Sequence, residues 1–211
     1  MPAMPGPVAD EKSALLAFLS QQRQNLRTIA FGLTDDQARS TPTVSALSVG
    51  ALIKHVTACE ASWVDRIAAA PGHPAADQIP FEQAVATYAD QYTMTAEDSL
   101  AGLLADLDAQ EAATQRIVAA AELDAPVPVP RSAPWFPQDV EAWSVRWVLC
   151  HVIEEAARHA GHADIIRETL DRATWFELMA AADGMAETPW LKPWKPANAR
   201  SSPAPPAPAQ P

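Results

Sequence analysis

Residues 147–170, which read WVLCHVIEEAARHAGHADIIRETL, decide the fold. Apolar side chains recur along this stretch at intervals typical of one buried helical face. They are Val148, Val152, Ala156, Ala163, Ile166 and Leu170. Extended toward its N-terminal side, the pattern predicts one long amphipathic helix over residues 140–170.

The rest of the chain repeats this helical period and shows none of the alternation typical of a β-strand. We predict three more long helices and a shorter one, over residues 10–33, 48–70, 81–121 and 174–182. The proline-punctuated stretch 123–137 is predicted to be a loop. Four long amphipathic helices joined by polar loops predict an all-α fold, a four-helix bundle with a short extra C-terminal helix.

The prolines divide the chain into a folded unit and a tail. The chain holds 20 prolines, many of them near the C-terminus. Residues 188–211 are rich in proline and alanine and lack an apolar period, so burial cannot offset the entropy that ordering removes. We predict one folded unit over residues 9–187 and a mobile tail over residues 188–211.

Composition narrows the function classes. The chain has 211 residues, of which 48% are hydrophobic, enough for a well-formed core. The formal net charge of −11 and the scattered lysines argue against binding nucleic acid or an anionic membrane. The sequence contains no run of about 18 apolar residues, so we predict no membrane span. Its first residues lack the pattern of a secretory signal. We expect a cytoplasmic protein, while monomer and homodimer both stay open.

The two cysteines, Cys59 and Cys150, fall inside apolar helical patterns far apart in the sequence. In a reducing compartment such residues are usually small buried thiols. We therefore predict that both are buried and that they form no disulfide.

Two chemically active side chains fall on the buried face of the predicted helix 140–170. On a helical wheel, His159 lies within about 10–20° of the apolar direction and Glu155 within about 50°. A buried ionised carboxylate is very unfavourable unless it is paired or binds a metal ion. Spacing of i, i+4 brings the two Cβ atoms to about 6 Å, a span that metal bonds of ~2.0–2.2 Å can bridge. The predicted third ligand is His55, at the margin of the apolar stripe of the second helix.

Three ligands of mixed nitrogen and oxygen type, with a coordination position left open, are typical of a catalytic metal site. The residues alone also allow Glu155 and His159 to pair with each other, or with Arg158 and Arg146, in a satisfied polar network. His55 and Cys59 form a His-x3-Cys pair as well, although packing is favoured over ligation for Cys59.

The remaining polar candidates on the face have weaker interpretations. Arg158 is a candidate for binding a substrate carboxylate, but a salt bridge to Glu154, Glu155 or a neighbouring helix is favoured over that role. His162 is favoured as a hydrogen-bonded histidine at the edge of the face. His151 and His73 are interpreted as solvated or loop histidines.

Residues 147–168 resemble the fourth-helix signature of the DinB-like metal-binding helix bundles. They are most similar to the branch that includes mycothiol-dependent enzymes and the metal-binding domain of mycothiol-dependent maleylpyruvate isomerase. Residues 15–39 and 52–56 resemble the first and second helices of that branch, so the likeness covers about residues 13–170. The isomerase carries a second domain beyond its bundle, whereas this chain continues into a short helix and a proline-rich stretch. We therefore expect a reaction other than isomerisation.

The resemblance implies a four-helix bundle that holds one divalent ion on His55, Glu155 and His159. Zinc is the expected ion, and nickel, cobalt and iron are alternatives because a mixed nitrogen and oxygen site accepts each of them. The resemblance further implies a thiol S-transferase that acts in detoxification. Its cosubstrate would be mycothiol or another low-molecular-weight thiol, which attacks a small electrophile as the thiolate. A non-catalytic metal-binding bundle and a metal-assisted hydrolase remain as alternative functions.

Overall fold

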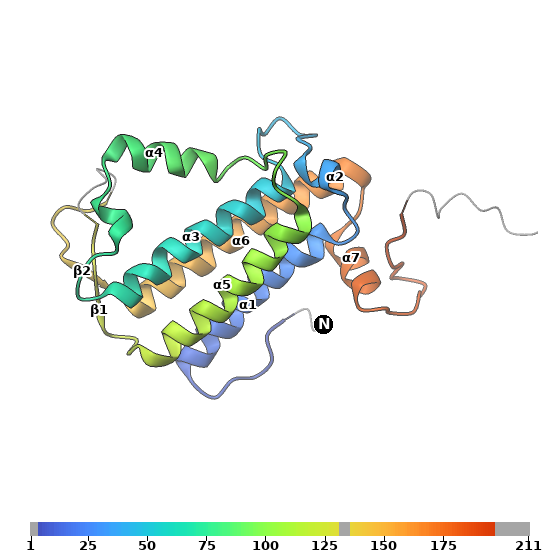
Figure 1. The fold of residues 1–211 in the computed structure, drawn as a ribbon. Coiled ribbons are helices and arrows are strands. Elements are labelled where there is room, and N and C mark those ends of the chain that lie inside the picture. Colours follow the sequence, from blue (N-terminus) through green and yellow to red (C-terminus); the bar gives the residue numbers. More distant parts are fainter. Residues whose placement is uncertain (1–3, 131–135, 197–211) are drawn as a thin grey trace, which may run out of the picture.

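The computed structural model describes residues 4–130 and 136–196 and is an all-α four-helix bundle, as predicted (Figure 1). Four long helices form the bundle, and the first two lie close to their predicted bounds. The four are α1 (Glu11–Ala30), α3 (Val49–Ala69), α5 (Leu100–Ala120) and α6 (Val145–Asp171). None of the helices in the described ranges combines the length and apolarity needed to cross a bilayer.

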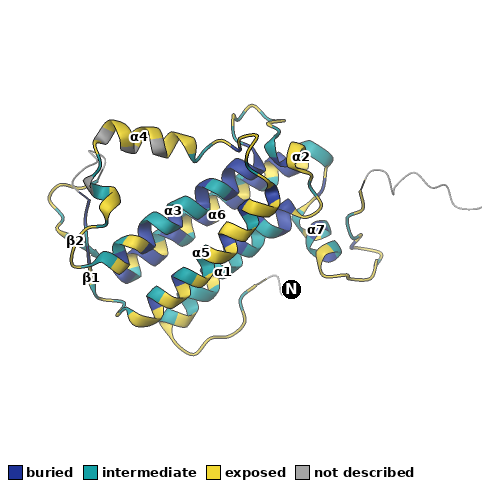
Figure 2. Ribbon diagram, in the orientation of Figure 1, coloured by how far each residue is buried: buried dark blue, intermediate teal, exposed yellow. Residues whose placement is uncertain are grey.

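Shorter elements connect the bundle helices or extend them. They are α2 (Asp35–Arg39), the 3-10 helix η1 (Ala75–Gln78), α4 (Phe81–Asp90), β1 (Pro126–Pro128), β2 (Ala142–Ser144) and α7 (Trp175–Ala182). The extra C-terminal helix α7 is the one that the sequence predicts. α4 lies outside the four-helix core and is largely exposed (Figures 1 and 2).

A polar residue directly before each bundle helix fixes where that helix begins. The hydroxyl oxygens of Ser48, Ser99 and Ser144 each accept a hydrogen bond, at 3.1 Å, from the backbone N–H three residues later. Asp10 does the same for α1 at 2.9 Å. Each cap satisfies a backbone donor that has no partner inside its helix.

The apolar stripes of the four helices meet in a continuous interior. α1 packs mainly against α6, and α3 packs against both α5 and α6. The buried faces appear as dark bands along these helices (Figure 2). α3 and α6 run antiparallel, because His55 lies near His159 while Trp63, two turns later, lies near His151. This pairing brings the site residues of the two helices together.

The prediction of one helix over residues 81–121 is wrong, because the chain leaves the helix between α4 and α5. The Asp98 carboxylate accepts hydrogen bonds from the backbone N–H of Thr95, at 2.7 Å, and from the Lys54 ammonium, at 2.8 Å. Threonine and aspartate that bond to local backbone groups compete with helix formation. The break turns α4 away from α5 and lets it cross beside α3.

The expectation that no strand occurs is also wrong. β1 and β2 pair antiparallel with Val127 opposite Trp143, and this pair replaces part of the predicted loop 123–137 and the first residues of the predicted helix 140–170. Strands of three residues are too short for an alternating pattern to be read. Two prolines in β1 further disguise it, because proline lacks a backbone donor.

The interior also contains a buried ion pair that the sequence analysis missed. Arg23 of α1 donates to Glu60 of α3 through Nε, at 2.9 Å, and through a terminal nitrogen, at 2.5 Å. Both side chains have 0% exposure. The Thr114 hydroxyl on α5 also donates to Glu60, and Glu111 lies 3.4 Å from Arg23. Each charged group of this network therefore has an oppositely charged partner within the network.

The chain after α7 folds back onto the end of the bundle. The guanidinium of Arg167 donates to the carbonyl oxygens of Ile29 and Phe31 and lies 5.0 Å from the ring of Trp194. That ring covers Gly32, whose φ of 73° favours glycine and where a Cβ would come within 2.5 Å of the indole. Residues 188–196, which the predicted tail included, therefore pack against the bundle, whereas the tail from residue 197 onward lies outside the described residues.

Candidate metal centre

The candidate site lies where the antiparallel helices α3 and α6 face each other. On α3, His55, Cys59 and Trp63 follow one another at intervals of four residues, so they share a face. The facing positions on α6 are held by His159 and Glu155, one turn apart. Each helix therefore contributes two potential metal donors at the same level of the bundle.

The four donor residues are close enough to act together. His159 Nε2 lies 3.3 Å from a carboxylate oxygen of Glu155, and the rings of His55 and His159 are 4.7 Å apart at their centroids. One ring nitrogen of His55, the sulfur of Cys59 and one oxygen of Glu155 all lie within 4.8 Å of one another. The structure thus places all three ligands predicted from the sequence at one level of the bundle, but its tightest donor group contains Cys59 in place of His159.

Burial sets the protonation of the imidazoles. Removal from water, and to a smaller extent the neighbouring His159, lower the pKa of His55 to about 4. Burial also lowers the pKa of His159, although Glu155 partly offsets that effect. Both rings are therefore neutral near pH 7, the form in which histidine binds metal ions. For Cys59, burial and the nearby Glu155 raise the pKa to about 12, so the metal-free thiol is neutral.

One buried atom of the site lacks a partner within the described part of the chain. His55 has 1% exposure, and its Nδ1 makes no hydrogen bond there. Buried polar nitrogens are nearly always bonded, and one beside a carboxylate and a second imidazole is well placed to bind a cation. The donor set fits a divalent ion of the zinc type.

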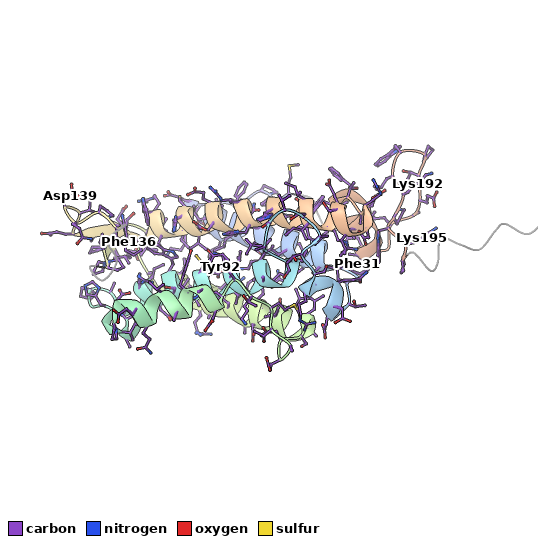
Figure 3. All side chains as sticks on the ribbon, turned by 90° about the horizontal axis from the view of Figure 1, so that it is seen from above. Phe31, Tyr92, Phe136, Asp139, Lys192 and Lys195 are labelled. Carbon is purple, nitrogen blue, oxygen red and sulfur yellow. The ribbon has the colours of Figure 1, made fainter. Side chains whose placement is uncertain are left out.

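Two tyrosines of α4 and the segment after it close the site from outside. The ring of Tyr92 stacks on His55 at 4.1 Å between centroids, and its hydroxyl lies 3.1 Å from His55 Nε2. The hydroxyl of Tyr88 lies 2.6 Å from that of Tyr92. Figure 3 shows Tyr92 between the ribbons of α4 and α6. Burial, followed by the Tyr88 hydrogen bond, raises the pKa of Tyr92, which therefore keeps its proton.

A cavity of about 740 Å³ opens beside the donors. Its lining combines Glu155 and His159 with side chains of α4 and of the next two turns of α6. The other lining residues are Leu47, Tyr88, Tyr92, Arg158, Gly161, His162 and Ile165. The cavity has the size of a small-molecule site and reaches two of the predicted ligands.

Arg158 and His162 both line this cavity, and Arg158 does so without the salt bridge that the sequence favoured. No carboxylate of the described residues lies within ion-pair distance of Arg158, so the expected salt bridge to Glu154, Glu155 or a neighbouring helix does not form there. His162 is half-buried at the cavity wall, next to the donors but outside their cluster.

The remaining cysteine and histidine predictions are confirmed only in part. Cys150 is exposed, contrary to the prediction of a buried thiol, because it lies on the outer side of α6. Cys59 is half-buried and packs against the core, as predicted, and its sulfur also lies within 4.8 Å of donor atoms of His55 and Glu155. His151 lies in α6, not in a loop, and is only partly exposed, since it stacks on Trp147 and contacts Trp63 edge-on.

Comparison with known proteins identifies the family. The mycothiol S-transferase family matches residues 14–172. The chain belongs to this DinB-like family. No curated protein matches it at a significant level. A crystal structure of a conserved protein from Enterococcus faecalis is similar with a TM-score of 0.53 and 15% identity, over 77% of this chain and 98% of that chain. At this identity the likeness concerns the fold alone.

The family match spans α1 to α6 and thus includes all four donor residues of this mycothiol S-transferase family member. The sequence allowed Tyr92 as a pocket-lining residue but favoured a core position for it, and it gave Tyr88 no role at the site. Their position depends on the break after α4, which the period of residues 81–121 does not reveal.

Proposed function

We propose that this protein is a divalent-metal-dependent thiol S-transferase that uses mycothiol to attack an electrophilic small molecule. His55, Glu155 and His159 would hold the ion, with zinc as the expected metal. The observation that carries the proposal is the family match over residues 14–172, combined with a cluster of neutral imidazoles and a carboxylate that opens into a cavity. A bound divalent ion would lower the pKa of a thiol and so supply the thiolate at neutral pH.

The chain's own residues would bind the reactants and exclude water. Tyr92 covers His55 from the side of α4 and keeps its hydroxyl proton, so it would act as a hydrogen-bond donor beside the site. Val152 and Ala156 of α6 are buried behind the donors and keep that side dry. A site that excludes water strengthens the electrostatic interactions within it.

Arg158 would bind an anionic group of one of the reactants. Its side chain lines the same cavity as Glu155 and His159, and within the described ranges it makes no ion pair. A guanidinium presents several donors in a fixed plane and suits a carboxylate. We therefore propose that the electrophile or the thiol places a carboxylate or a similarly charged group against Arg158.

The test measures metal content and conjugation on the same preparations. Purified protein is loaded with zinc, analysed for its elements, and incubated with mycothiol and a bimane-type electrophile. We expect one zinc per chain and conjugate formation, with both falling by more than about 100-fold for His159→Ala, because even outer-sphere partners of a metal contribute about 10–100-fold. His73→Ala is the matched control, because His73 pairs with Asp77 outside the site and both readouts should stay unchanged.

Other outcomes would assign a different function. Tight zinc binding without conjugate would favour a non-catalytic metal-binding bundle. Cleavage of ester or amide substrates without any thiol would favour a metal-assisted hydrolase. Zinc content that survives Glu155→Gln would show that the ligand assignment is wrong. The cytoplasmic location and the lack of nucleic-acid partners stay predictions from composition.

A further inference from the structure

Cys59 is the one member of the donor cluster to which the proposed function gives no role. It follows His55 by one turn of α3 and faces Glu155 of α6. Its sulfur, one nitrogen of His55 and one oxygen of Glu155 lie within 4.8 Å of one another. In a tetrahedral site with bonds of about 2.0–2.3 Å, donor atoms are roughly 3.3–3.7 Å apart. Side-chain rotations that move the donor atoms by about 1 Å would close that difference.

Two polar groups around Cys59 lack a matching partner among the described residues. Among the described residues, Nδ1 of His55 is buried without a hydrogen-bond partner. Glu155 has no guanidinium or ammonium within ion-pair distance in the same ranges, and only the imidazole of His159 contacts it. A carboxylate, two imidazoles and a thiol at one level of the bundle form a donor set that suits a divalent cation. A cation bound among them would satisfy all four groups.

We infer that Cys59 is a fourth protein ligand, so that the ion is held by two imidazoles, one carboxylate and one sulfur, and the thiol of the proposed function would enter as a fifth ligand. The inference rests on the metal site of the proposed function and deepens it. A sulfur donor favours zinc and cobalt over magnesium and manganese, whereas the three-ligand set discriminates less. The second cysteine, Cys150, is exposed on α6 and takes no part in the cluster.

X-ray absorption of the zinc-loaded full-length protein tests the inference directly. We expect one sulfur neighbour at about 2.3 Å beside nitrogen and oxygen neighbours at about 2.0–2.2 Å. Cys59→Ser should remove the sulfur neighbour and raise the zinc Kd by at least about 10-fold, as the loss of even an outer-sphere partner does. Cys150→Ser is the matched control, and it should leave both the spectrum and the Kd unchanged.

Cobalt substitution gives a second readout that does not depend on turnover. The cobalt-loaded wild type and Cys150→Ser should show a near-ultraviolet sulfur-to-cobalt charge-transfer band, which Cys59→Ser should lack. The wild-type spectra decide the matter even if Cys59→Ser folds poorly.

The two ways of failing are distinguishable. Stoichiometric zinc with nitrogen and oxygen neighbours only would overturn the assignment of Cys59 and leave the three-ligand site standing. A protein that takes up no stoichiometric zinc or cobalt would overturn the metal site and the role of Cys59 together.

Discussion

Two polar clusters lie on different sides of α3, and the adjacent residues Cys59 and Glu60 belong one to each. In the first cluster, Glu60 is matched by Arg23 and Thr114, so every charge has a partner inside the protein. In the second, a carboxylate, imidazoles and a thiol gather without a cation in the described residues. A buried polar group that has its counter-charge inside the protein belongs to the framework. Metal-donor side chains that gather without a cationic side chain indicate a ligand site.

Breaking the first cluster should have the largest effect. Arg23→Met leaves Glu60 buried with only the Thr114 hydroxyl, and loss of one partner of a buried pair costs about 3–5 kcal/mol. The free energy of unfolding in urea measures it. Arg27→Met, on the same helix but in more exposed ion pairs with Asp108 and Glu111, should cost about 1 kcal/mol or less. Equal effects of the two substitutions would contradict the framework role of Arg23.

Added zinc should stabilise the folded protein only by binding to the second cluster. At a free zinc concentration of about 100 times Kd, binding to the native state alone adds about 2.7 kcal/mol to the free energy of unfolding. Glu155→Gln and His159→Ala should abolish this gain, while Arg23→Met should retain it in the folded fraction. Thermal unfolding with zinc and with a chelator provides the measurement, and a gain that persists in both site variants would refute the assignment.

Acid should destabilise the metal-free protein through His55. Its pKa is about 4 in the folded state and about 6.5 in the unfolded state, so the unfolded chain takes up the proton first. The stability that neutral His55 contributes is full above pH ~6.5 and is lost as the pH falls toward 4, by about 2 kcal/mol. Urea unfolding of the wild type and of His55→Gln across this range measures the difference.

The measurement compares the wild type with His55→Gln because Asp164 changes the free energy of unfolding in the opposite direction as the pH falls. Burial raises the pKa of Asp164 to about 6, so its contribution to stability rises as the pH falls through that value. Asp164 is present in both proteins and cancels. An equal slope for the wild type and His55→Gln would show that His55 is not buried in its neutral form.

The smallest expected effect concerns Arg158. Arg158→Met should raise the KM for an anionic reactant by about 3–10-fold, which corresponds to about 1 kcal/mol, and leave zinc content unchanged. Arg116→Met, an equal change of charge at an exposed position of α5, is the control. The comparison uses conjugation kinetics with charged and neutral electrophiles of similar size. A KM that rises equally for the neutral electrophile would contradict a role in binding charge.

The helical periods were sufficient to predict the bundle and to place His55, Glu155 and His159 on facing surfaces. Apolar repeats are local features, so they can be recognised without knowledge of the neighbouring helices. The break between α4 and α5 could not be predicted in the same way, because Asp98 ends the helix partly through its contact with Lys54, a residue distant in sequence.

The buried ion pair left a signal that the sequence analysis passed over. Arg23 lies four residues after Leu19 and three before Leu26, and Glu60 is placed in the same way between Val56 and Trp63. Each therefore occupies a position of an apolar stripe, where a charged residue requires a partner. The sequence alone does not say that the two partners are each other, because that depends on the register of α1 against α3.

The adjacency of Cys59 and Glu60 makes the length of α3 as critical as its composition. One extra residue inserted between His55 and Cys59 would turn the rest of the helix by about 100°. Cys59 would then leave the donor cluster in the same event that carries Glu60 away from Arg23. A substitution can alter the donor cluster or the ion pair separately. An insertion or deletion in this turn would disrupt both together.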